Sequence, residues 1–184
     1  MKMMKKIFTL LSILLLSSGM MAQKFVTKNG SIRFFSETPM ESIEAVNNQV
    51  NAAYDYSSSK IVFKVLMKSF EFEKALMEEH FNENYVESDE FPNATFIGTV
   101  DNNSDIDLTK KGIVKVLVKG KLSIHGVTKE VAAEGEMIID ENLVQAKASF
   151  FVKPGDYDIK IPGAVVKNIA EEIEVTVDVS MKKL

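Results

Sequence analysis

Apolar and polar residues alternate with a period of two over much of the chain. The alternation is clearest in four segments, at residues 112–124, 131–139, 144–152 and 173–181. Successive side chains of a strand point to opposite faces, so this pattern predicts strands that each bury one face. Short polar connections at residues 126–128 and 140–142 join the first three segments, and residues 154–156 end the third; they suit antiparallel neighbours.

The N-terminal half predicts further strands with a weaker pattern. They fall at residues 31–36, 45–56, 61–70 and 95–100, with a turn at residues 57–59. One segment departs from the alternation, because apolar residues recur at helical spacing between Phe72 and Tyr85. A second, short helical turn is expected at Ala164–Asn168. About eight strands and one helical insertion predict a mainly β fold, an eight-stranded antiparallel barrel whose closure removes exposed edges.

The inward face of this barrel combines large and small apolar residues. Ten positions are predicted to line the lumen and bind a ligand: Phe34, Phe63, Val65, Phe96, Val116, Val118, Phe150, Val152, Val175 and Val177. Six small residues also fall on this face: Gly98, Gly120, Ala133, Gly135, Ala146 and Ala148. Eight-stranded barrels occur both filled by side chains and holding one small ligand, so the pattern leaves both states open.

The first 22 residues are typical of a secretory signal peptide. Three lysines precede a ten-residue apolar run, Ile7–Leu16, and small residues lead to Ala22. The run is far shorter than the roughly 20 residues of a membrane-spanning helix. We therefore expect cleavage near Ala22, a periplasmic or secreted protein, and one domain over residues 23–184 without a transmembrane segment.

Composition narrows the classes of partner. Without residues 1–22 the chain has 19 basic and 26 acidic residues, a formal charge of −7. An acidic protein is a poor partner for nucleic acid. The chain has no cysteine, so an exported form would depend on packing for its stability.

The two histidines are the obvious candidates for chemistry. His125 lies two residues after Ser123 on the face of its strand that points away from the lumen, but no glycine-rich elbow surrounds that serine. We expect His125 and Thr128 to satisfy backbone groups at a hairpin turn. His80 is expected to pack its ring beside Leu76 or Met77.

Neither a metal site nor a cofactor is expected. Zinc sites usually draw on several His or Cys ligands, and this chain has two distant histidines. The acidic run Asp101–Asp107 lacks the glycine and the twelfth-position glutamate of a calcium loop. A solvated hairpin loop is the better interpretation of that run.

Three motifs in order resemble the YceI-like proteins, exported barrels that bind polyisoprenoid or other long-chain lipids. They are GKLSIHGVTK at residues 120–129, FPNATF at 91–96 and DYDIKIP at 156–162. Asp158 departs from the family pattern, which has glycine there. The resemblance spans nearly all of residues 23–184 and implies a lipocalin-like extended barrel with a lipid in its lumen and no catalytic residues.

Three functions follow as hypotheses. The first is an exported, non-enzymatic protein that holds a polyisoprenoid-like or other amphiphilic lipid. The second is a stress-related or protein-interaction barrel with a lumen filled by side chains. The third, an enzyme acting on an amphiphile, lacks a catalytic constellation. The sequence leaves homodimerisation and the identity of the lipid open.

Overall fold

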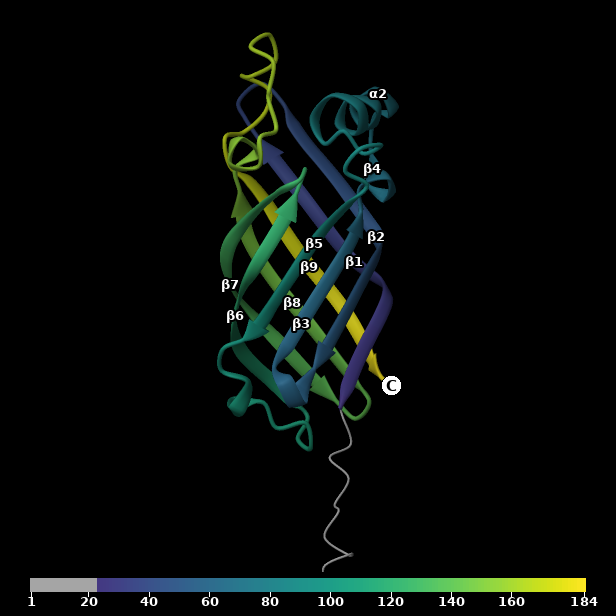
Figure 1. The fold of residues 1–184 in the computed structure, drawn as a ribbon, viewed down its shortest axis with the longest axis vertical. Coiled ribbons are helices and arrows are strands. Elements are labelled where there is room, and N and C mark those ends of the chain that lie inside the picture. Colours follow the sequence, from purple (N-terminus) through teal and green to yellow (C-terminus); the bar gives the residue numbers. More distant parts are fainter. Residues whose placement is uncertain (1–22) are drawn as a thin grey trace, which may run out of the picture.

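A computed structural model describes residues 23–184, so the predicted signal peptide lies outside the described residues. Eight long strands close into one antiparallel barrel, in the order β1-β9-β8-β7-β6-β5-β3-β2, with β2 paired back to β1 (Figure 1). The long strands are β1 (Lys24–Glu37), β2 (Ser42–Asp55), β3 (Lys60–Leu66), β5 (Asn93–Val100), β6 (Gly112–Ile124), β7 (Val127–Asp140), β8 (Leu143–Val152) and β9 (Ile173–Lys183). The predicted mainly β, closed barrel is confirmed.

The first strand is longer than the sequence pattern predicts, and its irregular pairing explains why. The strand expected at residues 31–36 is the second half of β1, which begins at Lys24. Its register with β2 shifts on both sides of Gly30, and such irregularities interrupt strict alternation. β6, in contrast, has the predicted bounds and pairs without interruption with β7.

The helical insertion is shorter than predicted. It comprises α2 (Ala75–His80) and a π-helical turn, η3 (Phe81–Tyr85), whereas Phe72 belongs to the two-residue strand β4 (Glu71–Phe72), which pairs with β2. The expected helical turn at Ala164–Asn168 is a pair of tight turns, in which Val165 N donates to Pro162 O and Asn168 N to Val165 O. The remaining short helical turns are η1 (Tyr56–Ser58), η2 (Met67–Ser69), η4 (Asn103–Asp105) and η5 (Pro154–Tyr157).

The hairpin between β6 and β7 turns one residue earlier than predicted. Ile124 pairs with Val127, which leaves His125 and Gly126 as a two-residue turn. Both have positive φ, 50° and 76°, as a tight hairpin with right-handed strand twist requires. Gly126 meets this requirement without strain, and a side chain there would also meet the Phe91 ring at 2.8 Å.

The loop at Asp101–Asp107 is more than a solvated turn. Ile106 is buried, and its carbonyl accepts a hydrogen bond of 2.9 Å from the Tyr56 hydroxyl. Asn103 donates to the Tyr56 carbonyl at 3.0 Å and accepts from the Tyr54 hydroxyl. The loop thereby covers the lower end of the barrel in Figure 1.

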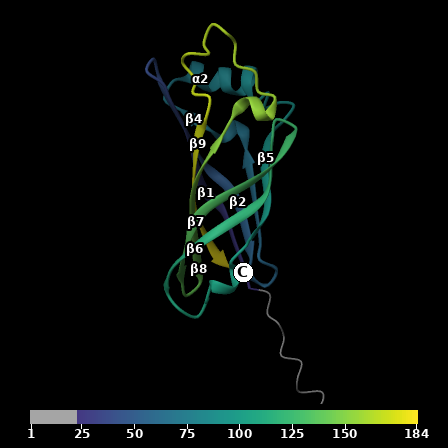
Figure 2. The same cartoon turned by 90° about the vertical axis from the view of Figure 1, so that its left-hand side faces the viewer.

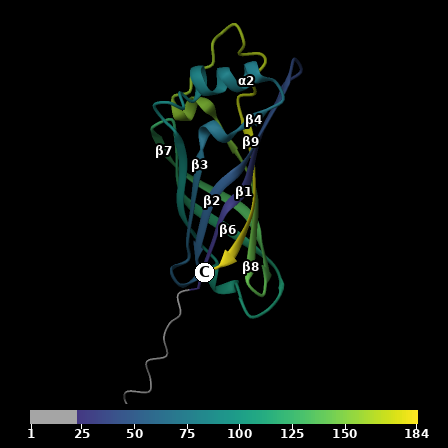
Figure 3. The same cartoon turned by 90° about the vertical axis from the view of Figure 1, so that its right-hand side faces the viewer.

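The two ends of the barrel differ in construction. Fully buried side chains of β2, β7, β8 and β9 fill the lower half, among them Tyr54, Met137, Val144, Val179 and Met181. At the upper end, α2 and the long segment between β8 and β9 lie across the barrel (Figures 1, 2 and 3). The upper end is therefore where the lumen has room for a ligand.

Candidate functional site: an apolar cavity open at one end

A cavity of about 560 Å³ occupies the barrel toward its upper end. This volume lies within the roughly 300–1,000 Å³ typical of ligand pockets. All ten residues predicted to face the lumen line it: Phe34, Phe63, Val65, Phe96, Val116, Val118, Phe150, Val152, Val175 and Val177. Their role in binding a ligand stays a prediction, but their common location follows directly from the strand alternation.

The small residues keep the cavity open in two ways. Ala133, Gly135, Ala146 and Ala148 line it directly on β7 and β8. Gly98 and Gly120 act differently, because a Cβ atom on them would lie 2.5 Å and 2.8 Å from the Phe96 ring. The Phe96 ring therefore lies against the wall over these two glycines, and this placement leaves the centre of the lumen free.

An aromatic cluster forms the upper part of the lining. The Phe34 ring lies 5.3 Å from Phe70, 5.6 Å from Phe72 and 5.4 Å from Phe81, centre to centre. Such separations are typical of favourable aromatic pairs. Phe70, Phe72 and Phe81 also line the cavity, which the sequence pattern did not predict. The helical spacing around Phe81 was visible, but the spacing alone does not show which surface the helix covers.

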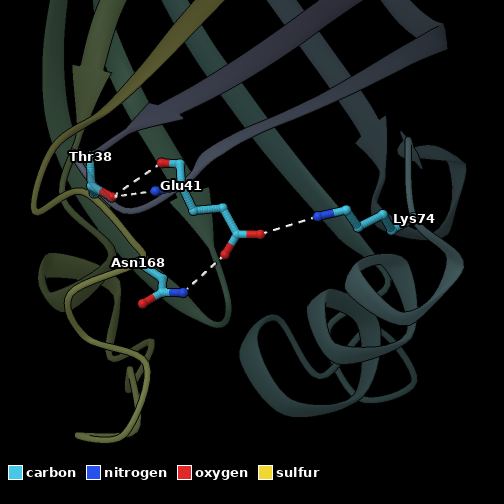
Figure 4. A network of polar contacts seen from close by, with 4 residues as sticks. All are labelled: Thr38, Glu41, Lys74 and Asn168. Carbon is cyan, nitrogen blue, oxygen red and sulfur yellow. Dashed lines mark hydrogen bonds and ion pairs between the residues drawn. The ribbon is translucent and has the colours of Figure 1, made fainter.

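Glu41 joins three segments at the mouth of the cavity. It follows the turn between β1 and β2, and Figure 4 shows its carboxylate between Lys74 and Asn168. Asn168 donates to one oxygen at 3.0 Å, and the Lys74 ammonium lies 3.3 Å from the other. The hydrogen bond from Asn168 and then the contacts with Lys74 lower the pKa of Glu41 below its ordinary value.

The same turn is tied to the β8–β9 segment a second time. The Ser36 hydroxyl, which is buried, accepts a hydrogen bond of 2.9 Å from Ala170 N. Thr38 fixes the turn itself, since its hydroxyl donates to Glu41 O and accepts from Glu41 N, both at 3.1 Å. The β1–β2 turn therefore holds α2 and the β8–β9 segment in place over the lumen.

The mouth is not sealed. Leu76 and Lys74 line the cavity although Leu76 is 62% exposed and the Lys74 side chain 61% exposed. His80 is also exposed and lines the cavity, while its expected packing beside Leu76 or Met77 stays a prediction. Lining residues that are also in contact with solvent show that the cavity opens between α2 and the β8–β9 segment.

His125 connects two further segments at the upper end of the barrel, those that contain Glu87 and Tyr157. Its side chain is only 10% exposed; Nδ1 lies 3.1 Å from the Tyr157 carbonyl and Nε2 lies 2.6 Å from the Glu87 carboxylate. Both ring nitrogens therefore have partners outside the hairpin. The expectation that His125 serves its own hairpin is wrong, because it bonds the segments that follow α2 and β8.

Residues with positive φ cluster around the contacts of His125. Four non-glycine residues among those described have positive φ, and three of them, Glu87, His125 and Asp158, belong to or adjoin this junction. Asp158 has φ of 57°, which explains why a glycine suits that position of the resembled motif. Strained residues persist only where surrounding contacts hold them.

The arrangement offers little support for catalysis. Both ring nitrogens of His125 contact Glu87 and Tyr157, while the Ser123 hydroxyl lies 2.7 Å from that of Thr128. Within residues 23–184, no three His, Asp or Glu side chains are placed to hold a metal ion together. Over the same residues, none of the helices has the length and apolarity to span a bilayer.

The chain is similar to known proteins in sequence and in fold. The sequence model of the YceI-like domain family matches residues 23–181. No curated protein sequence matches the chain. A polyisoprenoid binding domain from Saccharophagus degradans, implicated in plant cell wall breakdown, has a similar structure, with a TM-score of 0.77 at 11% identity. The match covers 89% of this chain and 99% of that one.

Two further solved structures share the fold. BcnA of Burkholderia cenocepacia has a TM-score of 0.67 at 12% identity, over 83% of this chain and 95% of that one. A Campylobacter jejuni YceI protein has a TM-score of 0.55 at 15% identity, over 75% and 82%. At such identities the likeness concerns the fold.

Proposed function

Because this chain belongs to the YceI-like domain family, we propose that it holds a long apolar lipid of the polyisoprenoid type in its barrel cavity. The observation that carries the proposal is the cavity of about 560 Å³, whose walls are built from the inward-facing valines, alanines and phenylalanines. The Saccharophagus degradans domain with the same fold is described as polyisoprenoid binding, which supports this choice of ligand.

Burial of apolar surface is the proposed source of affinity. Each Å² of apolar ligand surface removed from water contributes roughly 25 cal/mol. A chain of isoprene units can therefore bind tightly without a directional hydrogen bond. The polar groups of Glu41, Lys74 and Asn168 lie only at the mouth, where the polar end of an amphiphile would remain in water.

We also propose that the protein acts by binding and not by catalysis, and that it is exported. The first proposal is supported by the partners of His125, which engage both ring nitrogens. The second is supported by the signal-peptide pattern of residues 1–22. An open cavity disfavours the alternative of a lumen filled by side chains, because such a lumen would leave no space of this size.

Titration with a fluorescent polyprenyl probe tests the proposal. The chain from Gln23 onward should bind the probe with saturation at one site, and unlabelled polyprenol should displace it. A water-soluble aromatic dye of similar size serves as the control ligand. Failure to bind any long-chain lipid, with the barrel folded by circular dichroism, would contradict the proposal.

A further inference from the structure

Three exposed apolar side chains stand at the mouth of the barrel. Met40 is 70% exposed, Leu76 is 62% exposed and Val166 is 52% exposed. Each lies on a different segment: the β1–β2 turn, α2 and the β8–β9 segment. All three segments lie at the same end of the barrel in Figures 1, 2 and 3.

The contacts of Glu41 join the three segments that carry these residues. Met40 precedes Glu41, Leu76 follows Lys74 by two residues and Val166 precedes Asn168 by two. Since Glu41 contacts both Lys74 and Asn168, the three segments that carry these apolar residues meet at one polar junction (Figure 4). We call Met40, Leu76 and Val166 the rim patch.

The rim patch is continuous with the cavity. Leu76 belongs to both, because it is exposed and also lines the cavity. Glu41, Val165 and Asn168, next to or near the other two members, line the cavity as well. An apolar chain that leaves the cavity at this end would therefore meet the rim patch before it meets water.

We propose that the rim patch docks on the surface of a zwitterionic bilayer, with the cavity mouth facing the lipid. The proposal rests on the proposed function, since an apolar ligand that is nearly insoluble in water has a bilayer as its source. Exposed apolar side chains that enter the boundary between head groups and acyl chains gain free energy in proportion to the area they bury.

The charges beside the patch favour a zwitterionic surface over an anionic one. Carboxylates outnumber the single lysine, Lys74, over residues 71–83, which include α2. The β8–β9 segment carries both signs, with exposed Lys160 and Lys167 and the exposed carboxylates Asp156, Asp158, Glu171 and Glu172. The carboxylates complement lipid ammonium groups, and the two lysines complement lipid phosphates. An anionic leaflet attracts clusters of basic residues, and α2 would instead be repelled.

Tryptophan substitution gives a direct readout, because the chain contains no tryptophan. The variants Met40→Trp and Val166→Trp should each show a blue shift of emission when phosphatidylcholine–phosphatidylethanolamine vesicles are added. Ile113→Trp is the matched control, since Ile113 is 65% exposed and lies at the start of β6, toward the other end. No shift at the rim, an equal shift at position 113, or a shift that requires anionic lipid would overturn the proposal.

Transfer kinetics separate docking from ligand binding. The double variant Met40→Ser/Val166→Ser should take up a fluorescent polyprenyl probe from these vesicles about tenfold more slowly than the original chain. Its uptake from dilute detergent should be unchanged. Equal slowing in both media, or no slowing in either, would overturn the docking proposal. If the original chain takes up no probe from either medium, the proposed function fails, whereas the tryptophan shift still judges docking.

Discussion

Filling the cavity at Ala148 should abolish lipid binding without loss of stability. Ala148 lies in the middle of β8, where it pairs with Gly135 on β7 and Val177 on β9, and it lines the cavity. The substitution Ala148→Phe adds a phenyl ring to a position whose neighbours on β7 are small. The ring would then occupy space that the ligand needs.

The size of the effect follows from the apolar groups that the ring excludes. If it displaces about four methylene-sized groups of the ligand, at ~0.8 kcal/mol each, binding weakens by about 3 kcal/mol. This corresponds to a dissociation constant more than about a hundredfold higher. In a solidly packed lumen the same substitution would instead overpack the core and cost about 1–3 kcal/mol of folding free energy.

Two measurements on one variant distinguish these outcomes. Probe titration gives the dissociation constant, and urea unfolding without ligand gives the free energy of unfolding. Ser149→Phe is the matched control, because Ser149 is the next residue of β8 and is exposed on the outer face. Unchanged lipid affinity together with a large loss of stability in Ala148→Phe would refute the reasoning.

The polar junctions at the mouth give three further predictions. Folding lowers the pKa of Glu41, so its contacts stabilise the protein at pH values above the ordinary carboxyl pKa of 4.5, and this stabilisation is lost as the pH falls through the lower folded pKa. The difference in unfolding free energy between the original chain and Glu41→Gln should therefore be clear at pH 7 and should vanish in unfolding curves recorded in acid. His125→Ala should lower the free energy of unfolding by about 1–3 kcal/mol, because it removes a partner of the carbonyl of buried Tyr157. The control Ser123→Ala should change it little, and equal effects would contradict the role of His125. Asp158→Val should lower the free energy of unfolding by about 1–2 kcal/mol in the urea assay, because φ is 57° at this position, and Asp158→Gly should not lower it. An unfolding free energy unchanged by the valine would contradict the backbone strain at this position.

The barrel and its inward face could be predicted because alternation is a local signal. Each inward residue of β6, β8 and β9 follows from its neighbours two positions away, and closure follows from the number of strands and their short connections. Only the second half of β1 could be predicted, because the register shifts around Gly30 interrupt the alternation of its apolar and polar residues.

The construction of the mouth could not be predicted. The bonds of Glu41 to Lys74 and Asn168 join residues 33 and 127 positions apart, and no local pattern encodes such contacts. The same holds for His125, whose partners lie 38 and 32 positions away. Sequence spacing placed His125 next to a turn, whereas it is the first residue of that turn, and spacing could not show which segments pack over it.

Native mass spectrometry of the gently purified protein tests the central claim most directly. The spectrum should contain a complex of the chain from Gln23 onward with one long-chain lipid. Organic extraction should release the lipid and leave a folded protein that binds added polyprenol again. A protein that carries no lipid and binds none after incubation with polyprenol would contradict the account.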